Sequence, residues 1–281
     1  MRLIVAVLQR VTGKSCLILE YPPTADNAPR YGYGRGVHQG LAEIIGRDEP
    51  RYAQTLQRFT AYADDLARIE VSAIDPSQPS WVNDFLPGLD GAAIYCFLRA
   101  RTPRRYMEIG SGNSTKFAAR ARRDGRCGTW MTSIDPHPRA EIDMLCDEVI
   151  RRPLETVSLS TFDVLSPGDI LFFDGSHRVF MNSDAVAFFL DVLPSLPAGV
   201  LVGVHDVYLP SDYPPEVAGR YYSEQYLLAA HLLGGGNVEI ELASHYVSGH
   251  PELSHALDPL WTCPGLGSVQ RHGVAFWFTK R

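Results

Sequence analysis

Two runs of apolar residues with no polar alternation constrain the fold of this chain more than any other feature. They are DILFFDG at 169–175 and GVLVGVHD at 199–206, and a helical pattern at 182–193 lies between them. Strands that are apolar on both sides are buried on both sides, which is the situation of a parallel sheet covered by helices. The pattern therefore predicts a doubly wound α/β fold.

The same alternation of strand and helix patterns continues through the chain from about residue 81. It breaks near the end, where NVEIELAS at 237–244 and GVAFWFTK at 273–280 are two strand patterns with no helix pattern between them. We therefore expect a final antiparallel hairpin that carries a long insertion. The other expected strands are 105–110, 129–135 and 149–153, and the expected helices are 89–101, 115–123, 139–147, 182–193 and 222–234.

The first part of the chain differs, and we expect an N-terminal helical and irregular extension (1–80) before the main domain (81–281), with the junction at DPSQPS (75–80). The tyrosine-rich segment YPPTADNAPRYGYGRG at 21–36 suits either a lid or an oligomer contact. A helix is expected within 43–69. Its apolar face, recurring at intervals of three and four residues, consists of Tyr52, Leu56, Phe59, Ala63 and Leu66.

Composition narrows the class of protein. With 281 residues and 45% apolar or aromatic residues, the chain has the composition of an ordinary globular protein, and its net charge of −6 argues against nucleic acid as the main partner. Five widely spaced cysteines without a C-x-x-C pair indicate a reducing compartment. The apolar start is too short for a membrane span, so we expect a cytoplasmic protein. A basic cluster is expected to be a solvated helix face: Lys116, Arg120, Arg122, Arg123 and Arg126.

The stretch RRYMEIGSGNSTKFAARA at 104–121 predicts a strand, a glycine turn and a helix. A dinucleotide-binding fingerprint beginning at Gly110 would need a third glycine at position 115, where the chain has Thr115. Gly110 and Gly112 still allow the backbone to approach a ligand, and Glu108 can accept hydrogen bonds. The alternative is a plain tight turn with no ligand.

An acidic residue ends the next expected strand. Asp135 comes twenty-three residues after Gly112, which is close to the spacing at which an acid chelates ribose hydroxyls in dinucleotide sites. An ordinary exposed turn aspartate is the alternative, but the glycine turn upstream favours the ligand.

The two apolar strands that we began with also end in polar residues: Asp174 and His177 follow one, and His205 and Asp206 follow the other. If these strands are neighbours, the four side chains face one cavity, because ligands of open parallel sheets lie beyond the carboxyl ends of the strands. Carboxylates with histidine could bind a divalent metal, or an imidazole could act as a general base. Separate loop hydrogen bonds are the alternative.

In these motifs the chain resembles the class I S-adenosylmethionine-dependent methyltransferases, most closely a bacterial branch with EIGSGNST, IDPHPR, GDILFFDGSH, HDVYLPSDYP, YYSEQYLL and a final FWF strand. The resemblance covers about residues 80–281. It implies a Rossmann-like sheet of seven mostly parallel strands in the order 3-2-1-4-5-7-6, with strand 7 antiparallel, and adenine near 154–163. It implies these cofactor-binding residues: Glu108, Gly110, Ser111, Gly112, Asn113, Ser114, Asp135 and Pro136.

Some oxygen methyltransferases of this fold bind Mg²⁺ through an acid after strand 4 and an acidic pair after strand 5. The resemblance thus implies a Mg²⁺ or Mn²⁺ site formed by Asp174, His205 and Asp206, although His205 stands where a carboxylate or amide is commoner. The implied catalytic groups are His177, His205 and Asp174.

The expected activity is methylation of a hydroxyl of a small molecule, with S-adenosylmethionine as cofactor and assistance from a divalent metal or a histidine base. Two other classes stay open. One is an accessory subunit that binds S-adenosylmethionine or a nucleoside without catalysis, and the other is a nicotinamide-dependent oxidoreductase, against which Thr115 and the antiparallel tail argue. No nucleic-acid or membrane partner is expected, and homo-oligomerisation is left open.

Overall fold

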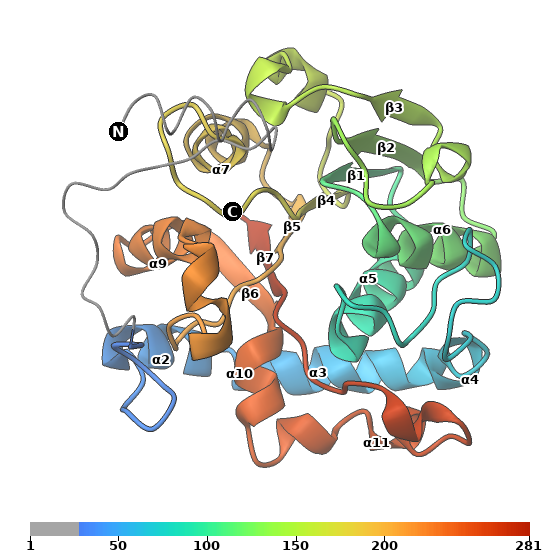
Figure 1. The fold of residues 1–281 in the computed structure, drawn as a ribbon, viewed down its shortest axis with the longest axis horizontal. Coiled ribbons are helices and arrows are strands. Elements are labelled where there is room, and N and C mark those ends of the chain that lie inside the picture. The colour runs from blue at the N-terminus through green and yellow to red at the C-terminus, as the bar shows by residue number, and fades with distance from the viewer. Residues whose placement is uncertain (1–27) are drawn as a thin grey trace, which may run out of the picture.

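The computed structural model describes residues 28–281, and within that range a single sheet of seven strands forms the centre of the molecule (Figure 1). The strand order is β3-β2-β1-β4-β5-β7-β6, and β7 runs antiparallel to both of its neighbours. This confirms the expected fold class and the final hairpin. The strands are β1 (Arg105–Ile109), β2 (Trp130–Ile134), β3 (Glu148–Ile150), β4 (Ile170–Phe173), β5 (Leu201–Val204), β6 (Val238–Ala243) and β7 (Phe276–Lys280).

The two apolar strands β4 and β5 lie side by side in the middle of the sheet, and every residue of both is buried. Gly203 in β5 allows Trp277 of β7 to pack closely against the sheet. A Cβ at position 203 would come within 2.6 Å of the Trp277 ring. The ring of Trp277 stacks on Phe172 instead, with 5.3 Å between centroids. The absence of polar alternation in these strands is thus explained by helices on both faces of the sheet.

Helices cover both sides of the sheet: α5 and α6 pack together on one side, and α7 and α9 lie on the other (Figure 1). α5 is buried over nearly all of its length, which explains its lack of a polar face. The helix expected over 182–193 is present as a continuous helical stretch whose middle is a π-helix. The elements are α5 (Gly88–Arg101), α6 (Asn113–Gly125), α7 (Asp184–Ala187), the π-helix η5 (Phe188–Val192), α8 (Leu193–Ser195) and α9 (Glu224–Leu233).

The prediction of a helix over 139–147 is wrong. Only a single 3₁₀ turn, η2 (Asp143–Leu145), forms there. Pro136 and Pro138 precede this segment, and the amide of Asp147 already bonds to the carbonyl of Met131 in β2. Too few residues therefore remain between the prolines and β3 for a helix of regular length.

The N-terminal helices pack onto the sheet and its helices. The expected single helix over 43–69 is divided, since Pro50 is compatible only with the first turn of a helix. Its predicted face is nevertheless buried, with Ala63 partly so. α3 packs against β6 and α5, and α2 packs against α9. The pieces are α2 (Gln39–Gly46), α3 (Glu49–Phe59), η1 (Thr60–Tyr62) and α4 (Ala63–Leu66).

Residues 28–38 lie against the segment that follows β5. Asp212 accepts hydrogen bonds from the amides of Arg30 (2.5 Å) and Tyr31 (3.0 Å), and the amide of His38 bonds to the carbonyl of Pro210 at 3.0 Å. Residues 21–27 of the proposed lid lie outside the described residues. The division of the chain at residue 80, and a lid or oligomer role for 21–36, remain predictions.

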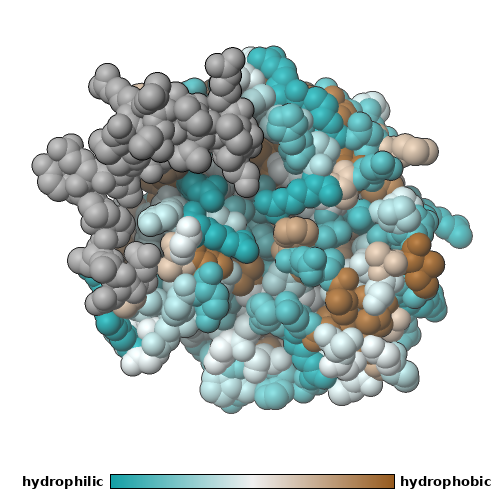
Figure 2. Space-filling view, viewed as in Figure 1, coloured by the Kyte–Doolittle hydropathy of each residue, from teal (hydrophilic) through white to brown (hydrophobic). Residues whose placement is uncertain are grey.

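The hairpin insertion between β6 and β7 is helical, and short 3₁₀ turns occur in other loops. Teal and white residues cover most of the face shown in Figure 2, and brown residues form small separate patches. Among residues 28–281, no helix combines the length and apolar composition that crossing a membrane requires. The remaining elements are α10 (Ser244–Gly249), η7 (Leu253–His255), α11 (Asp258–Trp261), η8 (Leu266–Ser268), η3 (Leu154–Thr156), η4 (Leu159–Phe162) and η6 (Pro215–Arg220).

Candidate active site

The glycine turn after β1 is held against the end of β4. Gly110 has a φ of +78°, and a Cβ at this position would lie 1.8 Å from the carbonyl oxygen of Asp174. No residue with a side chain fits there without moving the backbone. Thr115, which replaces the third glycine of a dinucleotide fingerprint, caps the helix, because its hydroxyl accepts a hydrogen bond from the amide of Gly112 at 3.0 Å. As a result α6 begins at Asn113, two residues earlier than expected.

Glu108 lies behind this turn rather than at the surface of a cavity. Its side chain is 1% exposed, and the hydroxyl of Thr115 donates to it at 2.5 Å. Burial raises the pKa of Glu108 to about 8, although the hydroxyls of Ser114 and Thr115 act in the opposite direction. The structure thus gives Glu108 a supporting position under the turn, and its predicted contact with the cofactor remains a prediction.

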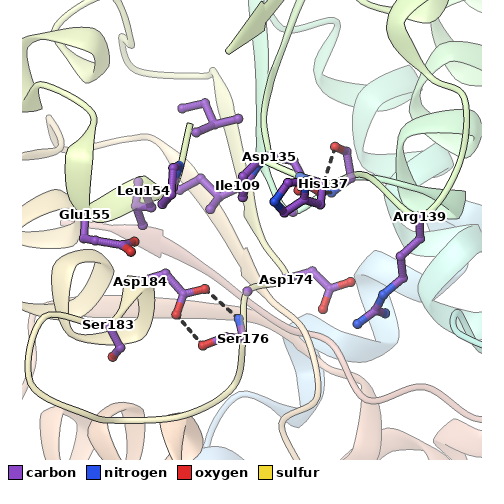
Figure 3. A pocket seen from close by; sticks show the side chains of 16 residues that line it. Ile109, Asp135, His137, Arg139, Leu154, Glu155, Asp174, Ser176, Ser183 and Asp184 are labelled. Atoms are coloured by element: carbon purple, nitrogen blue, oxygen red, sulfur yellow. Dashed lines mark hydrogen bonds between the residues drawn. The ribbon is translucent and has the colours of Figure 1, made fainter. Parts of the chain in front are cut away.

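A cleft of about 450 Å³ opens beyond the ends of β1, β2 and β4 (Figure 3). Asp135 lines it and accepts hydrogen bonds from the amides of Ser111 and His137, both at 2.8 Å. At another part of the cleft, Asp184 accepts from the amide (2.6 Å) and the hydroxyl (2.5 Å) of Ser176. Of the predicted cofactor residues, this cleft is lined by Gly110, Ser111, Asp135 and Pro136, and Leu154 from the expected adenine segment joins them.

Two smaller cavities adjoin this cleft. One of about 130 Å³ is lined by the predicted residues Gly112, Asn113 and Ser114, and the other, of about 190 Å³, is lined by His205 and Asp206. All three spaces are lined by Asp174 and Arg139. Figure 3 shows the side chains of these two residues turned toward each other at one end of the large cleft. We name two of the three spaces after the roles that we propose for them below: the cofactor cleft (about 450 Å³) and the acceptor cavity (about 190 Å³).

The polar residues that end β4 and β5 are brought together as expected. His177 places Nε2 at 3.3 Å from Asp174 Oδ1 and 3.5 Å from Asp206 Oδ2. His205 places Nδ1 at 3.5 Å from Asp174 Oδ1 and 3.7 Å from Asp206 Oδ1. Each carboxylate therefore faces both imidazoles. Two of these four residues, His177 and Asp206, have positive φ, a strained conformation that is concentrated at functional sites.

Two buried acids support the imidazoles from behind, and sequence reasoning assigned neither of them to this cluster. Glu224 is fully buried, and its Oε1 lies 2.6 Å from His177 Nδ1. Asp90, also fully buried, lies 3.4 Å from His205 Nε2 and accepts from the amides of Val274 and Ala275, just before β7. The available signal for Asp90 was one acid in the otherwise apolar run GLDGAAIYCFL.

The acids control the charge of the histidines. Burial lowers the pKa of His177, but Glu224, Asp174 and Asp206 outweigh this effect and raise the pKa to about 9. Burial likewise lowers the pKa of His205, and Asp174 and Asp206 raise it well above the usual value. Burial raises the pKa of Asp174, but the two histidines lower it to about 2. At neutral pH the cluster therefore pairs cationic imidazoles with carboxylates.

Only one of the two predicted catalytic histidines faces a cavity. His205 lines the acceptor cavity, whereas His177 lines none of the three spaces and its ring is covered by Tyr222, with 4.4 Å between ring centroids. Sequence reasoning missed most of this cavity, because segments 83–87 and 270–274 line it and carry no motif.

The predicted metal ligands are not arranged as a metal site in residues 28–281. Among residues 28–281, no group of three or more His, Cys, Asp or Glu side chains is arranged to hold one. Asp174 and Asp206 direct their oxygens at the two imidazoles instead. The structure therefore offers no support for the metal site predicted from Asp174, His205 and Asp206.

Residues 107–207 match a family model described as a methyltransferase domain. This chain contains a methyltransferase domain. The matched segment runs from β1 to just beyond β5, so it includes the glycine turn, Asp135 and the cluster of Asp174, His205 and Asp206. Together with the strand order, the match confirms the recognition of a class I methyltransferase from the sequence motifs. None of the curated proteins searched matches the chain.

Among solved structures, the chain is similar to an O-methyltransferase from Bacillus cereus in complex with SAH (17% identity, 86% of this chain and 96% of that chain, TM-score 0.41). It is also similar to a SAH-bound methyltransferase from Podospora anserina (15% identity, 75% and 93%, TM-score 0.39). A third is a putative O-methyltransferase from Klebsiella pneumoniae (12% identity, 86% and 94%, TM-score 0.41). Likenesses at this level carry no argument about function.

Proposed function

We propose that this protein transfers the methyl group of S-adenosylmethionine to a hydroxyl oxygen of a small molecule. The observation that carries the proposal is the shared wall between the cofactor cleft and the acceptor cavity, where Asp174 and Arg139 line both. A cofactor in one space and an acceptor in the other would meet at this wall. Holding two reactants in line in this way supplies a large part of the catalysis of methyl transfer.

The cofactor cleft suits the nucleoside part of S-adenosylmethionine. The Asp135 carboxylate lines the cleft and retains lone pairs for ribose hydroxyls beyond the two amide hydrogen bonds that it accepts. Pro153 and Leu154 offer apolar contact to an adenine ring at the same cleft. The positive sulfonium group would lie near the Asp174 carboxylate, where the three spaces meet.

In the proposed step the acceptor oxygen forms a bond to the methyl carbon while the carbon–sulfur bond breaks. The bonding pair goes to sulfur, which becomes a neutral thioether, and the hydroxyl proton passes to the protein. Asp206 is placed to take this proton, since it lines the acceptor cavity. The charged imidazole of His205 stabilises the oxygen as negative charge develops, and His177 holds the carboxylates from behind. The proposed step needs no metal, because Asp206 can take the proton and the charged imidazole of His205 can stabilise the oxygen.

The acceptor cavity indicates a small, polar acceptor. It is bordered by charged and hydrogen-bonding side chains from Asp84, Asp206, Arg220 and His272, with the Tyr222 ring on one side. A cavity of about 190 Å³ accommodates a compact molecule or one end of a larger one.

The test combines binding with turnover. Calorimetry should show binding of S-adenosylhomocysteine, and a panel of hydroxylated acceptors should reveal methyl transfer that the Asp206→Asn variant loses while still binding S-adenosylhomocysteine. Failure of the wild type to bind S-adenosylhomocysteine would overturn the cofactor assignment. Tight binding without turnover on any acceptor would favour an accessory subunit that binds the cofactor without catalysis.

A further inference from the structure

The first turn of α9 buries two adjacent polar side chains. Glu224 and Gln225, in the middle of the motif YYSEQYLL at 221–228, are both 0% exposed. Neighbouring positions on a helix face directions about 100° apart, so the two side chains reach different parts of the molecule. Burying a polar group is costly unless it has hydrogen-bond partners, and the partners therefore show what each residue holds in place.

Glu224 and the residue before it hold the loop that follows β4. Glu224 Oε1 lies 2.6 Å from His177 Nδ1. The Ser223 amide donates to the carbonyl of His177 at 2.7 Å, and the Ser223 hydroxyl accepts from the amide of Val179 at 2.9 Å. These contacts fix a residue with strained backbone, because His177 has a φ of +64°. With Nδ1 engaged by Glu224, the imidazole presents Nε2 to the proposed base Asp206, at 3.5 Å.

Gln225 holds the segment that follows β5 instead. Its side-chain oxygen accepts from the amide of Tyr208 at 2.8 Å, and its side-chain nitrogen donates to the carbonyl of Ser211 at 3.3 Å. The Gln225 amide donates to the hydroxyl of Tyr213 at 3.2 Å. Tyr208 lines the acceptor cavity, whereas neither Glu224 nor Gln225 lines any of the three spaces. Gln225 therefore acts on the acceptor cavity from behind, through the position of Tyr208.

The charge of Glu224 exceeds what holding a loop requires. Glu224 Oε2 is buried and has no hydrogen-bond partner within the described part of the chain. A buried carboxylate with an unpartnered oxygen is more costly than a neutral side chain that makes the same contact. What the charge adds is a stronger hydrogen bond to the cationic imidazole of His177. The ring is thereby held more firmly between Asp174 and Asp206.

We infer that the first turn of α9 positions the acceptor side of the site in two separable ways: Glu224 fixes the base Asp206 through His177, and Gln225 fixes the wall of the acceptor cavity through Tyr208. The inference rests on the proposed function, because it takes the base and the acceptor cavity from it. Both are positioning residues, since neither touches the reacting atoms. Loss of Glu224 should therefore change kcat, loss of Gln225 should change the acceptor KM, and neither should change cofactor affinity.

The experiment measures kcat and KM with an acceptor that the wild type methylates. Glu224→Gln keeps the shape of the side chain and an oxygen for His177 Nδ1, but removes the charge. It should lower kcat by about 10- to 100-fold, the effect of a slightly misplaced catalytic group, and leave the acceptor KM within about 2-fold. Gln225→Met removes the acceptor of the Tyr208 amide. It should raise the acceptor KM by about 10-fold, the effect of one lost hydrogen bond, and leave kcat within about 2-fold.

Calorimetric titration with S-adenosylhomocysteine counts the folded sites of each variant, and kcat is expressed per folded site. Glu216→Gln is the control, because Glu216 is an exposed acid in η6 whose side chain makes no hydrogen bond or ion pair within residues 28–281. It should change neither parameter. All variants should bind S-adenosylhomocysteine with the affinity of the wild type.

Three results would overturn the inference and leave the proposed function standing. One is a wild-type kcat per folded site in Glu224→Gln, another is an equal loss of kcat in Glu224→Gln and Gln225→Met, and the third is the absence of folded sites in Glu224→Gln, which would show a role in folding alone. A wild type that binds S-adenosylhomocysteine and methylates no acceptor would instead overturn the proposed function, and the inference with it.

Discussion

The cofactor cleft and the acceptor cavity share a wall but are built in different ways. In the cofactor cleft, the carboxylate of Asp135 is held by backbone amides of adjacent turns, those of Ser111 and His137. In the acceptor cavity the carboxylates Asp174 and Asp206 are held by side chains, the imidazoles of His177 and His205. Backbone hydrogen bonds thus hold the Asp135 carboxylate in the cofactor cleft, the cofactor half of the site. Side-chain charge holds the carboxylates of the acceptor cavity, the acceptor half.

This difference has consequences for substitution. A change in the cofactor half should disturb the path of the chain, and with it both stability and cofactor binding. A change in the acceptor half should alter chemistry while the fold and the cofactor affinity survive. Four experiments test this contrast.

The largest effect is expected from Gly110→Ala. The added Cβ would overlap the carbonyl oxygen of Asp174, and the positive φ adds about 1–2 kcal/mol of strain. We expect a strongly lowered melting temperature and no measurable S-adenosylhomocysteine binding. Gly168→Ala is the matched control, because Gly168 has a φ of +92° with nothing within 4 Å of its Cβ position. It should lose only the strain energy and bind the ligand normally, as thermal unfolding and calorimetry would show.

Asp206→Asn should lower kcat by about 100-fold, within the range for removing a general base, with S-adenosylhomocysteine affinity retained. Asparagine tolerates the left-handed backbone of this position, where φ is +54°, so the fold should be preserved. Asp84→Asn changes an acid in the same cavity that has no imidazole partner in the described structure, and it should affect KM alone. Equal losses of kcat in both variants would contradict the assigned role of Asp206.

The pH dependence of the stability of Glu108→Gln tests the cofactor half of the site. The pKa of Glu108 is raised from 4.5 to about 8, so the folded state retains a proton that the unfolded state loses above pH 4.5. Its contribution to the free energy of unfolding is therefore complete below pH 4.5 and is lost as the pH rises to 8. The melting temperature of Glu108→Gln relative to the wild type should rise by about 5 °C between pH 5 and pH 8. A difference that stays constant with pH would contradict the raised pKa.

The smallest effect is expected from removing divalent cations. Because Asp174 and Asp206 face imidazoles, a chelator should change the methyl-transfer rate by less than about 2-fold, and added Mg²⁺ or Mn²⁺ should not increase it. The readout is the initial rate with and without chelator. A rate that collapses and returns with Mg²⁺ would show that the acceptor half reorganises around a metal.

The contrast also explains which parts of the site were predictable. Gly110, Asp135, Asp174 and His205 each follow an apolar strand directly, and parallel strands bring their ends to one edge whatever the intervening helices do. That these four residues lie close together could therefore be predicted from the order of strands and helices along the chain. The helix expected over 139–147 failed because proline positions and strand pairing, rather than apolar spacing, decide that connection.

The remaining residues could not be predicted because their roles depend on packing between distant parts of the chain. Glu224 reaches His177 across 47 residues, and Asp90 reaches the start of β7 across 184. Lys116 has the sequence surroundings of a solvated helix face, but it is only 9% exposed. Sequence periodicity carries no information about such contacts.

The attachment of residues 28–38 to the segment after β5 has a consequence for the acceptor cavity. The segment that matches the family model ends at Val207, and Asp212, which accepts hydrogen bonds from the amides of Arg30 and Tyr31, follows four residues after Tyr208, which lines the acceptor cavity. This border of the acceptor cavity is therefore held in part by residues outside the matched segment. Under the proposed function, substitutions in residues 28–38 would reach the acceptor side of the site and spare the cofactor cleft, which no residue of that segment lines.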